Sequence, residues 1–176
     1  MPGQHTIAPP VLADAAALWR LARDSRTLDL NSPYAYALWC RDFAGTSVVA
    51  KAEGRIIGFV TGYRRPSSPD VAMVWLVAVD PSQRRKNLAA AMLDDLVARL
   101  VRDGVRYLET TIAPGNDASI RLFASFATRW NAPVGRTGFL APSDFPSEVG
   151  AHEPEELYRI GPLAHDNVHA TVRMRA

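Results

Sequence analysis

Cysteine is nearly absent from this chain of 176 residues, because Cys40 carries its single thiol. One cysteine excludes an internal disulfide framework and fits a reducing compartment. The chain also lacks an apolar run approaching the ~20 residues that span a bilayer. Residues 1–5 lack the basic and apolar segments of a signal peptide. We therefore expect a cytoplasmic protein with no membrane partner.

The chain also has no large excess of positive or negative residues, since its net charge is only +2. That value is too small to indicate a nucleic-acid partner, and Glu153, Glu155 and Glu156 argue against a basic face near the end of the chain. No cluster of histidine and cysteine has zinc spacing, so we expect no metal. The length and the hydrophobic content of 48% are those of an ordinary single globular domain.

Hydrophobic periodicity predicts that this domain has an α/β fold. Helical spacing of apolar residues follows Asp14, Pro33 and Asn116. A fourth helix begins near Leu88 and is stopped by Gly104. Extended runs predict strands at residues 47–52, 55–63, 71–79, 105–112 and 156–160. Alternation of strands with helices is typical of α/β domains.

Local signals refine three of these elements. Asp14 is a candidate cap for the first helix. Glu53 and Gly54 stand between two extended runs and predict a hairpin turn. The run at residues 71–79 is almost wholly apolar, so we expect a strand that is buried on both faces.

The ends of the chain are expected to lie outside the domain. We expect residues 1–8 to be disordered, residues 9–163 to form the domain and residues 164–176 to form a C-terminal tail. The segment after Pro133 contains several further prolines and predicts irregular structure up to the last strand.

The basic turn between the 71–79 strand and the following helix is the most informative stretch. It places Arg84, Arg85 and Lys86 where a helix begins. The positive end of a helix dipole disfavours each cation there by roughly 0.3–1 kcal/mol. Free backbone N–H groups and added positive charge together make an anion site. The alternative interpretation is a solvated basic loop.

This turn resembles the coenzyme-A loop of the GNAT superfamily of acyl-CoA-dependent N-acetyltransferases, whose pattern is Gln/Arg-x-x-Gly-x-Gly/Ala. Arg84 matches the first position and Ala89 the last, while Asn87 stands where the family usually has glycine. Asparagine tolerates the left-handed region better than most residues, so we expect the loop to work. The resemblance implies a mixed central sheet flanked by helices, acetyl-CoA as cosubstrate, and coenzyme contacts from Arg84, Arg85, Lys86, Asn87, Leu88 and Ala89.

Two further segments match this family. The strand before the loop offers backbone groups to the pantetheine arm and the thioester carbonyl, and the matching residues here are Val77, Ala78 and Val79. The stretch 116–123 resembles the second coenzyme motif, which implies contacts from Asn116, Ser119 and Phe123. A simple helix cap is the alternative for Asn116. The family often has a tyrosine acid where Phe123 stands, and phenylalanine cannot donate a proton. Water or another group must then serve, or the thiolate leaves unprotonated.

A narrower resemblance covers most of the chain, from about residue 29 to residue 163. Residues 30–36, 74–80, 104–111 and 152–162 are similar to segments of one branch, the L-2,4-diaminobutyrate acetyltransferases of ectoine biosynthesis. The branch implies transfer of an acetyl group to the γ-amine of diaminobutyrate, usually in a homodimer.

A pocket for a diamino acid needs carboxylates, a flat apolar wall and donors for the acid end. The candidates for substrate binding are Asp29, Tyr34, Trp75, Glu109, His152 and Glu155. Trp75 can lie against an ammonium as a cation–π partner, although an indole in an apolar strand is also an ordinary core residue. Glu109 can equally be an edge carboxylate, and residues 152–156 can equally be a solvated acidic loop.

The chemistry requires a neutral amine. An amine with a pKa near 10.4 is free base in only about one molecule in 2,500 at pH 7. Many relatives place a glutamate base on the strand before the coenzyme loop, but residues 71–79 contain no carboxylate. We therefore expect Glu109 or Asp29 to act as base through water, with the oxyanion held by a backbone N–H near Val77.

Other functions remain open at this point. The chain could acetylate another small amine or a peptide N-terminus, and a panel of amine substrates would separate these activities. It could also be a non-catalytic acyl-CoA-binding module, which would bind the coenzyme without turnover.

Overall fold

The computed structural model describes residues 5–26 and 28–164. In this part of the chain, seven strands form one mixed sheet in the order β1-β2-β3-β4-β5-β7-β6. The strands are β1 (Thr6–Ala8), β2 (Val48–Ala52), β3 (Arg55–Arg65), β4 (Ser68–Val79), β5 (Tyr107–Ile112), β6 (Val134–Leu140) and β7 (Glu155–Ile160). The α-helices are α1 (Ala15–Ser25), α2 (Pro33–Arg41), α3 (Leu88–Arg102) and α4 (Asp117–Arg129). Short 3-10 turns are η1 (Leu12–Asp14), η2 (Ala44–Thr46), η3 (Pro81–Gln83), η4 (Pro142–Asp144) and η5 (Ser147–Val149). The expected α/β fold with a mixed central sheet is confirmed.

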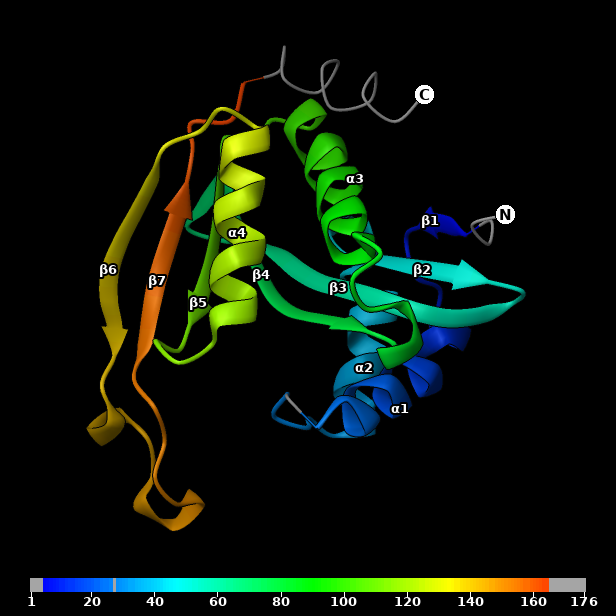
Figure 1. Ribbon diagram of the computed structural model, residues 1–176, viewed down its shortest axis with the longest axis horizontal. Helices are drawn as coiled ribbons and strands as arrows, with labels where there is room; N and C mark the ends of the chain where they lie inside the picture. Colours follow the sequence, from blue (N-terminus) through cyan, green and yellow to red (C-terminus); the bar gives the residue numbers. More distant parts are fainter. Residues whose placement is uncertain (1–4, 27, 165–176) are drawn as a thin grey trace.

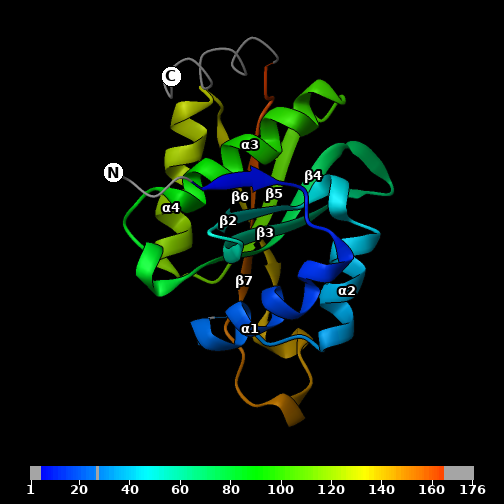
Figure 2. The ribbon, with the colours of Figure 1, turned by 90° about the vertical axis from the view of Figure 1, so that its right-hand side faces the viewer.

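Helices cover the sheet from both sides (Figures 1 and 2). The larger core lies between the sheet and helices α3 and α4, and a smaller core lies between β2–β4 and helices α1 and α2. Alternate residues of β2 enter the two cores, with Val48 facing α3 and Val49 facing α1 and α2. This alternation follows from the two-residue period of a strand.

Helix α3 follows the predicted leucine and methionine stripe. Leu88, Met92, Leu96 and Leu100 are all buried, with exposed fractions of 4% or less. Burying a side chain of this size stabilises a fold by about 1.5–3 kcal/mol. The helix is joined to α4 by the buried carboxylate of Asp94, which accepts hydrogen bonds from the Arg129 guanidinium at 3.0 and 3.1 Å and from Trp130 Nε1 at 3.0 Å.

The predicted hairpin turn is present between β2 and β3. Glu53 and Gly54 both have positive φ, 50° and 75°, as a tight hairpin of two residues requires. The expected role of Asp14 as a side-chain cap is wrong, although it does occupy the N-cap position of α1. Its carboxylate accepts instead from Val11 N at 3.0 Å and from Lys51 Nζ at 2.7 Å.

Two segments that were expected to be irregular are strands. Thr6–Ala8 forms β1 and pairs with β2, so the domain begins earlier than residue 9. Val134–Leu140 forms β6 at the opposite edge and pairs with β7. Six of its seven residues are exposed, so backbone pairing rather than a buried apolar face specifies this strand. The tail expected from residue 164 onward lies outside the described residues, apart from Ala164.

Candidate functional site

Strands β4 and β5 diverge beyond their paired segment (Figure 1), and a cleft lies between them. The two strands pair in parallel from Val71 opposite Tyr107 to Val74 opposite Thr110, and the pairing stops there although both strands continue. The space between them has a volume of about 780 Å³. Its walls are Leu28, Asp29, Asn31, Val74, Trp75, Leu76, Val77, Thr110, Thr111, Ile112, Ala113, Gly115, Asn116, Ser119, Phe123, Ala151, His152, Glu153 and Glu155. A strand edge without a neighbour offers its backbone groups to a ligand.

A β-bulge turns Trp75 toward this cleft. In the pairing of β3 with β4, Thr61 lies opposite Leu76 and Gly62 lies opposite Val74, so Trp75 has no partner in β3. Its indole is 46% exposed and lies 4.9 Å, centroid to centroid, from the ring of Trp39 on α2. The expectation that β4 is buried on both faces therefore fails at Trp75, because the bulge re-aims one side chain.

The basic turn lies between the end of β4 and α3, outside the residues that line the cleft. Asn87 is the N-cap of α3 and has φ 56° and ψ 19°. This left-handed conformation is the one expected at the position where the family usually has glycine. Arg84, Arg85 and Lys86 are exposed. Among the described residues, neither arginine forms a salt bridge with a carboxylate, so both side chains are available to an anion at the start of α3.

Asp80 holds the beginning of this turn in shape. Its carboxylate accepts hydrogen bonds from Ser82 N at 2.8 Å and from Ser82 Oγ at 2.7 Å. These bonds, to the Ser82 hydroxyl first, lower the pKa of Asp80 below its usual value, and the charge of Arg84 adds a smaller effect in the same direction. Asp80 therefore stays ionised and fixes the chain between β4 and the basic turn.

The first turn of α4 forms the wall opposite β4. Asn116 is the N-cap, and its Oδ1 accepts from Ser119 N at 3.1 Å. Ser119 and the buried ring of Phe123 follow on the face that lines the cleft. The side chain of Glu153 lies close to Gly115, where an added Cβ would come within 3.3 Å of its Oε1.

Three polar side chains line the cleft, and we call Asp29, His152 and Glu155 the acidic mouth. They come from the α1–α2 connection, the β6–β7 connection and the start of β7. His152 Nε2 lies 3.8 Å from Asp29 Oδ2. The side chain of Asp29 is almost fully exposed, so the mouth meets solvent. Two carboxylates on one opening favour a cationic ligand.

Glu109 is not part of this cleft, contrary to the expectation from the sequence. Its side chain is only 4% exposed, and its two oxygens accept from Arg159 at 2.7 Å and from Arg65 at 3.2 Å. A carboxylate occupied in this way is poorly placed to take a proton from a substrate. Tyr34 also lies away from the cleft walls and is 71% exposed on α2.

The structure thus brings eight of the 18 residues singled out in the sequence to the cleft wall. Asp29, Trp75, Val77, Asn116, Ser119, Phe123, His152 and Glu155 line the cleft. Thr110 and Thr111 were missed, although two adjacent hydroxyl residues at the end of a strand were a visible signal. Asn31 and Glu153 were also missed, because their place depends on loops that meet only in the folded chain.

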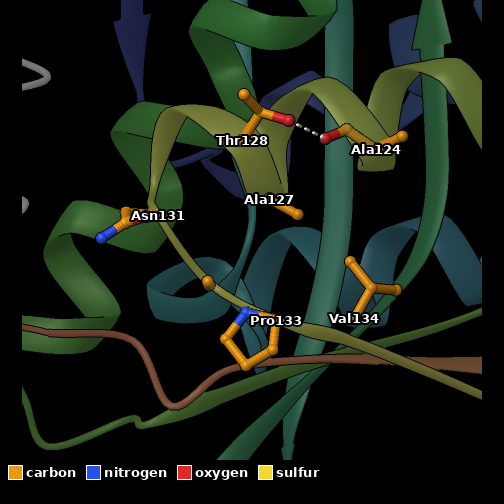
Figure 3. Close-up of a pocket in the computed structure, with 7 residues that line it drawn as sticks. Ala124, Ala127, Thr128, Asn131, Pro133 and Val134 are labelled. Atoms are coloured by element: carbon orange, nitrogen blue, oxygen red, sulfur yellow. Dashed lines mark hydrogen bonds between the residues drawn. The ribbon is translucent and has the colours of Figure 1, made fainter.

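A second hollow of about 570 Å³ lies between the end of α4 and the start of β6 (Figure 3). None of the described residues that line it carries a charge. The Thr128 hydroxyl donates to the Ala124 carbonyl oxygen at 3.1 Å, so it is already engaged. This hollow offers no acid, base or nucleophile and is not a candidate active site.

The described part of the chain has neither a candidate metal cluster nor a membrane-spanning helix. No group of three or more histidine, cysteine, aspartate or glutamate side chains there could hold a metal ion. No helix there is long and apolar enough to cross a bilayer.

Comparison with known proteins identifies the family to which this chain is similar. Residues 15–127 match the acetyltransferase (GNAT) family. An L-2,4-diaminobutyric acid acetyltransferase of Streptomyces avermitilis is 53% identical over 167 residues, covering 94% of this chain and 92% of the relative. One of Halalkalibacterium halodurans is 43% identical over 158 residues, covering 90% of this chain and 82% of the relative.

A solved structure has the same fold. It is a diaminobutyrate acetyltransferase from Paenibacillus lautus in complex with L-2,4-diaminobutyric acid and coenzyme A, with a TM-score of 0.86 and 40% identity. The match covers 91% of this chain and 96% of that one. The ribosomal-protein-S18-alanine N-acetyltransferase from Escherichia coli, at 18% identity and a TM-score of 0.71, covers 92% of this chain and 96% of its own, and shares the fold alone. The chain therefore belongs to the GNAT family of acetyltransferases.

Proposed function

We propose that this protein transfers the acetyl group of acetyl-CoA to the γ-amine of L-2,4-diaminobutyrate, a step of ectoine biosynthesis. The observation that carries the proposal is the likeness, at 40% identity, to an enzyme solved with that diamino acid and coenzyme A. The site supports it, because the acidic mouth lines the cleft between β4 and β5 and the basic turn directly follows β4. These are the features that a coenzyme carrying phosphates and a cationic amine would require.

The coenzyme half of the site is the basic turn and the free edge of β4. Arg84, Arg85 and Lys86 would hold phosphate oxygens together with the backbone N–H groups at the start of α3. The left-handed backbone of Asn87 supports this assignment, because it turns the chain as a glycine would. Beyond Val74, β4 has no β5 partner, so backbone groups near Val77 can meet the pantetheine arm and the thioester.

The amine half of the site is the acidic mouth with the exposed indole of Trp75. A diamino acid brings two ammonium groups and one carboxylate. Asp29 and Glu155 supply the opposite charge for the ammonium groups, and His152 can hydrogen-bond to either end of the molecule. The Trp75 ring supplies a flat wall and a cation–π surface beside the thioester position.

Acetyl transfer then needs one proton to leave the γ-ammonium. For an amine with a lysine-like pKa, the neutral form at pH 7 lies roughly 4.6 kcal/mol above the ammonium form. Asp29, acting through water, takes that proton, since Glu109 is held between two arginines. The amine nitrogen attacks the carbonyl carbon and forms the N–C bond, while a backbone N–H near Val77 stabilises the oxyanion.

The C–S bond breaks next, and its electron pair leaves with the sulfur. The second proton of the nitrogen passes through water to the thiolate, because the buried phenyl ring of Phe123 cannot donate one. One acetamide and one thiol are formed, and the proton taken by Asp29 returns to solvent. No covalent acyl-enzyme is required.

The test is release of free coenzyme A from acetyl-CoA with L-2,4-diaminobutyrate as acceptor. The expected product carries the acetyl group on the γ-nitrogen, which two-dimensional NMR distinguishes from the α-isomer. Turnover with other small amines or a peptide N-terminus, but not with diaminobutyrate, would refute the proposed substrate. Coenzyme binding with no turnover of any amine would instead leave a binding module.

We also propose that the protein works as a homodimer. Strand β6 supports this, since it is an edge strand whose Val134 and Phe139 are 46% and 54% exposed. An exposed apolar edge favours pairing with another chain. Sedimentation equilibrium should give twice the chain mass, and Phe139→Lys should lower it. A monomer at micromolar concentration would contradict this.

A cytoplasmic location is likewise our proposal, and the single cysteine supports it. Burial raises the pKa of the Cys40 thiol to about 11, with a smaller contribution from the charge of Asp14. A buried thiol of high pKa is unreactive and needs no disulfide partner. Fractionation of cells that make the protein would test this location.

A further inference from the structure

The connection between β6 and β7 is a loop in which one pair of stacked rings joins two separate positions. It projects past the end of the sheet, near the α1–α2 connection (Figures 1 and 2). The ring of Phe145 lies parallel to the imidazole of His152, with centroids 3.6 Å apart and planes 9° apart. Phe145 does not line the cleft, whereas His152 does.

The local sequence explains why these rings meet. Phe145 is followed by Pro146, which restricts the preceding residue to extended conformations, and Phe145 has φ −99° and ψ 146°. Gly150 has φ 87° and ψ −171°, a conformation open to glycine and strained for other residues. Asp144 fixes the start of the loop by accepting from Ala141 N at 2.7 Å.

The stack presents one defined edge of the His152 imidazole to the cleft. Nδ1 lies 2.7 Å from the carbonyl oxygen of Glu153. A carbonyl oxygen only accepts, so Nδ1 carries the hydrogen, and Nε2 of the neutral ring carries a lone pair. Nε2 then faces Asp29 Oδ2 across 3.8 Å. Two acceptors at this separation leave room for one ammonium nitrogen about 2.8 Å from each.

We propose that Phe145 is a positioning residue for the amine substrate: its ring holds the His152 imidazole with the Nε2 lone pair turned toward Asp29, so that both accept from one substrate ammonium. The inference rests on the proposed function, because it requires a cationic acceptor. Phe145 acts only through His152 and has no contact with the cleft. It should therefore affect recognition of the amine and leave coenzyme binding alone.

Steady-state kinetics test the positioning role with matched variants. Phe145→Leu keeps an apolar side chain but loses the ring stack. The KM for diaminobutyrate should therefore rise about 3–10-fold, which corresponds to the free energy of one aromatic pair. The KM for acetyl-CoA should not change. Phe145→Tyr keeps a flat ring and should restore the KM for the amine. Equal loss in both variants, or an equal rise in both KM values, would overturn the proposal.

NMR of the imidazole nitrogens tests the same geometry without turnover. The His152 signals are identified by their absence in His152→Gln. At pH 8 the parent should show Nδ1 protonated and Nε2 bare, and Phe145→Leu should shift the ring toward the opposite tautomer. An Nε2-protonated ring in the parent would refute the proposal, even if Phe145→Leu does not fold. Because this readout needs no substrate, it is independent of whether diaminobutyrate is the acceptor.

Discussion

Glu109 lies in an ion-pair cluster, so removing its charge tests whether this carboxylate is structural or catalytic. Glu109 is on β5, and its partners Arg65 and Arg159 come from β3 and β7. The Arg159 guanidinium also lies over the Tyr107 ring, 4.1 Å from its centroid. In Glu109→Gln the side chain keeps its shape and loses its charge. Two guanidinium groups then face each other with no anion between them.

The expected cost can be estimated from the exposure of these groups. Removing one partner of a fully buried ion pair costs about 3–5 kcal/mol. Here the glutamate side chain is 4% exposed, but the two arginine side chains are 40% and 42% exposed, so water can solvate them in the variant. We therefore expect Glu109→Gln to lower the free energy of unfolding by about 2–3 kcal/mol. For a chain of this size that lowers Tm by about 4–12 °C.

Urea unfolding and acetyl transfer should be measured on the same preparations. Asp95→Asn is the control, since Asp95 forms a partly exposed i,i+4 pair with Arg99 at 3.3 Å and its loss should cost about 0.5 kcal/mol or less. Below its unfolding temperature, Glu109→Gln should keep kcat within a few-fold of the parent. Unchanged stability together with a loss of kcat of about 100-fold or more would show that Glu109 is the general base after all.

Three further predictions concern the two halves of the cleft. Arg84→Ala and Arg85→Ala should each weaken acetyl-CoA binding about tenfold at low salt and less at high salt, because phosphate contacts are screened; equal effects at both salt levels, by calorimetry, would argue for a structural role. Asn87→Gly should bind acetyl-CoA at least as tightly as the parent, since glycine adopts the observed φ of 56° more easily; a clear loss would mean that the asparagine side chain makes a contact. Asp29→Ala and Glu155→Ala should each reduce kcat/KM for diaminobutyrate about tenfold or more, while the Kd for acetyl-CoA stays the same; parent-like kinetics in both would remove them from the amine site.

The features that the sequence predicted correctly rest on local signals. The Glu53-Gly54 turn has two positive φ angles, and Gly54 between two extended runs indicates it. The buried stripe of α3 follows from helical spacing, and the left-handed Asn87 follows from the position of a family glycine. Each of these depends on residues within a few positions along the chain.

The features that were missed depend on contacts between distant segments. The partners of Glu109 lie 44 and 50 residues away in the sequence, so nothing near residue 109 distinguishes a buried ion pair from a base. Trp75 was a candidate wall residue, but its apolar run could equally have placed it in the core, and only the bulge against β3 and the separation from β5 decide between the two. Strand β6 has no buried face, so its pairing with β7 left no hydrophobic pattern to detect.

The central claim is that the cleft fits one diamino acid between the acidic mouth and the thioester beside Val77. The measurement that tests it most directly is kcat/KM for diaminobutyrate, ornithine and lysine, which differ by one methylene each. The reacting nitrogen must come within ~3–3.5 Å of the thioester carbon, and a longer chain would overshoot or buckle against Trp75. One methylene typically changes kcat/KM by about 10–200-fold, so ornithine should be poor and lysine poorer. Lysine acetylated as efficiently as diaminobutyrate would contradict the account.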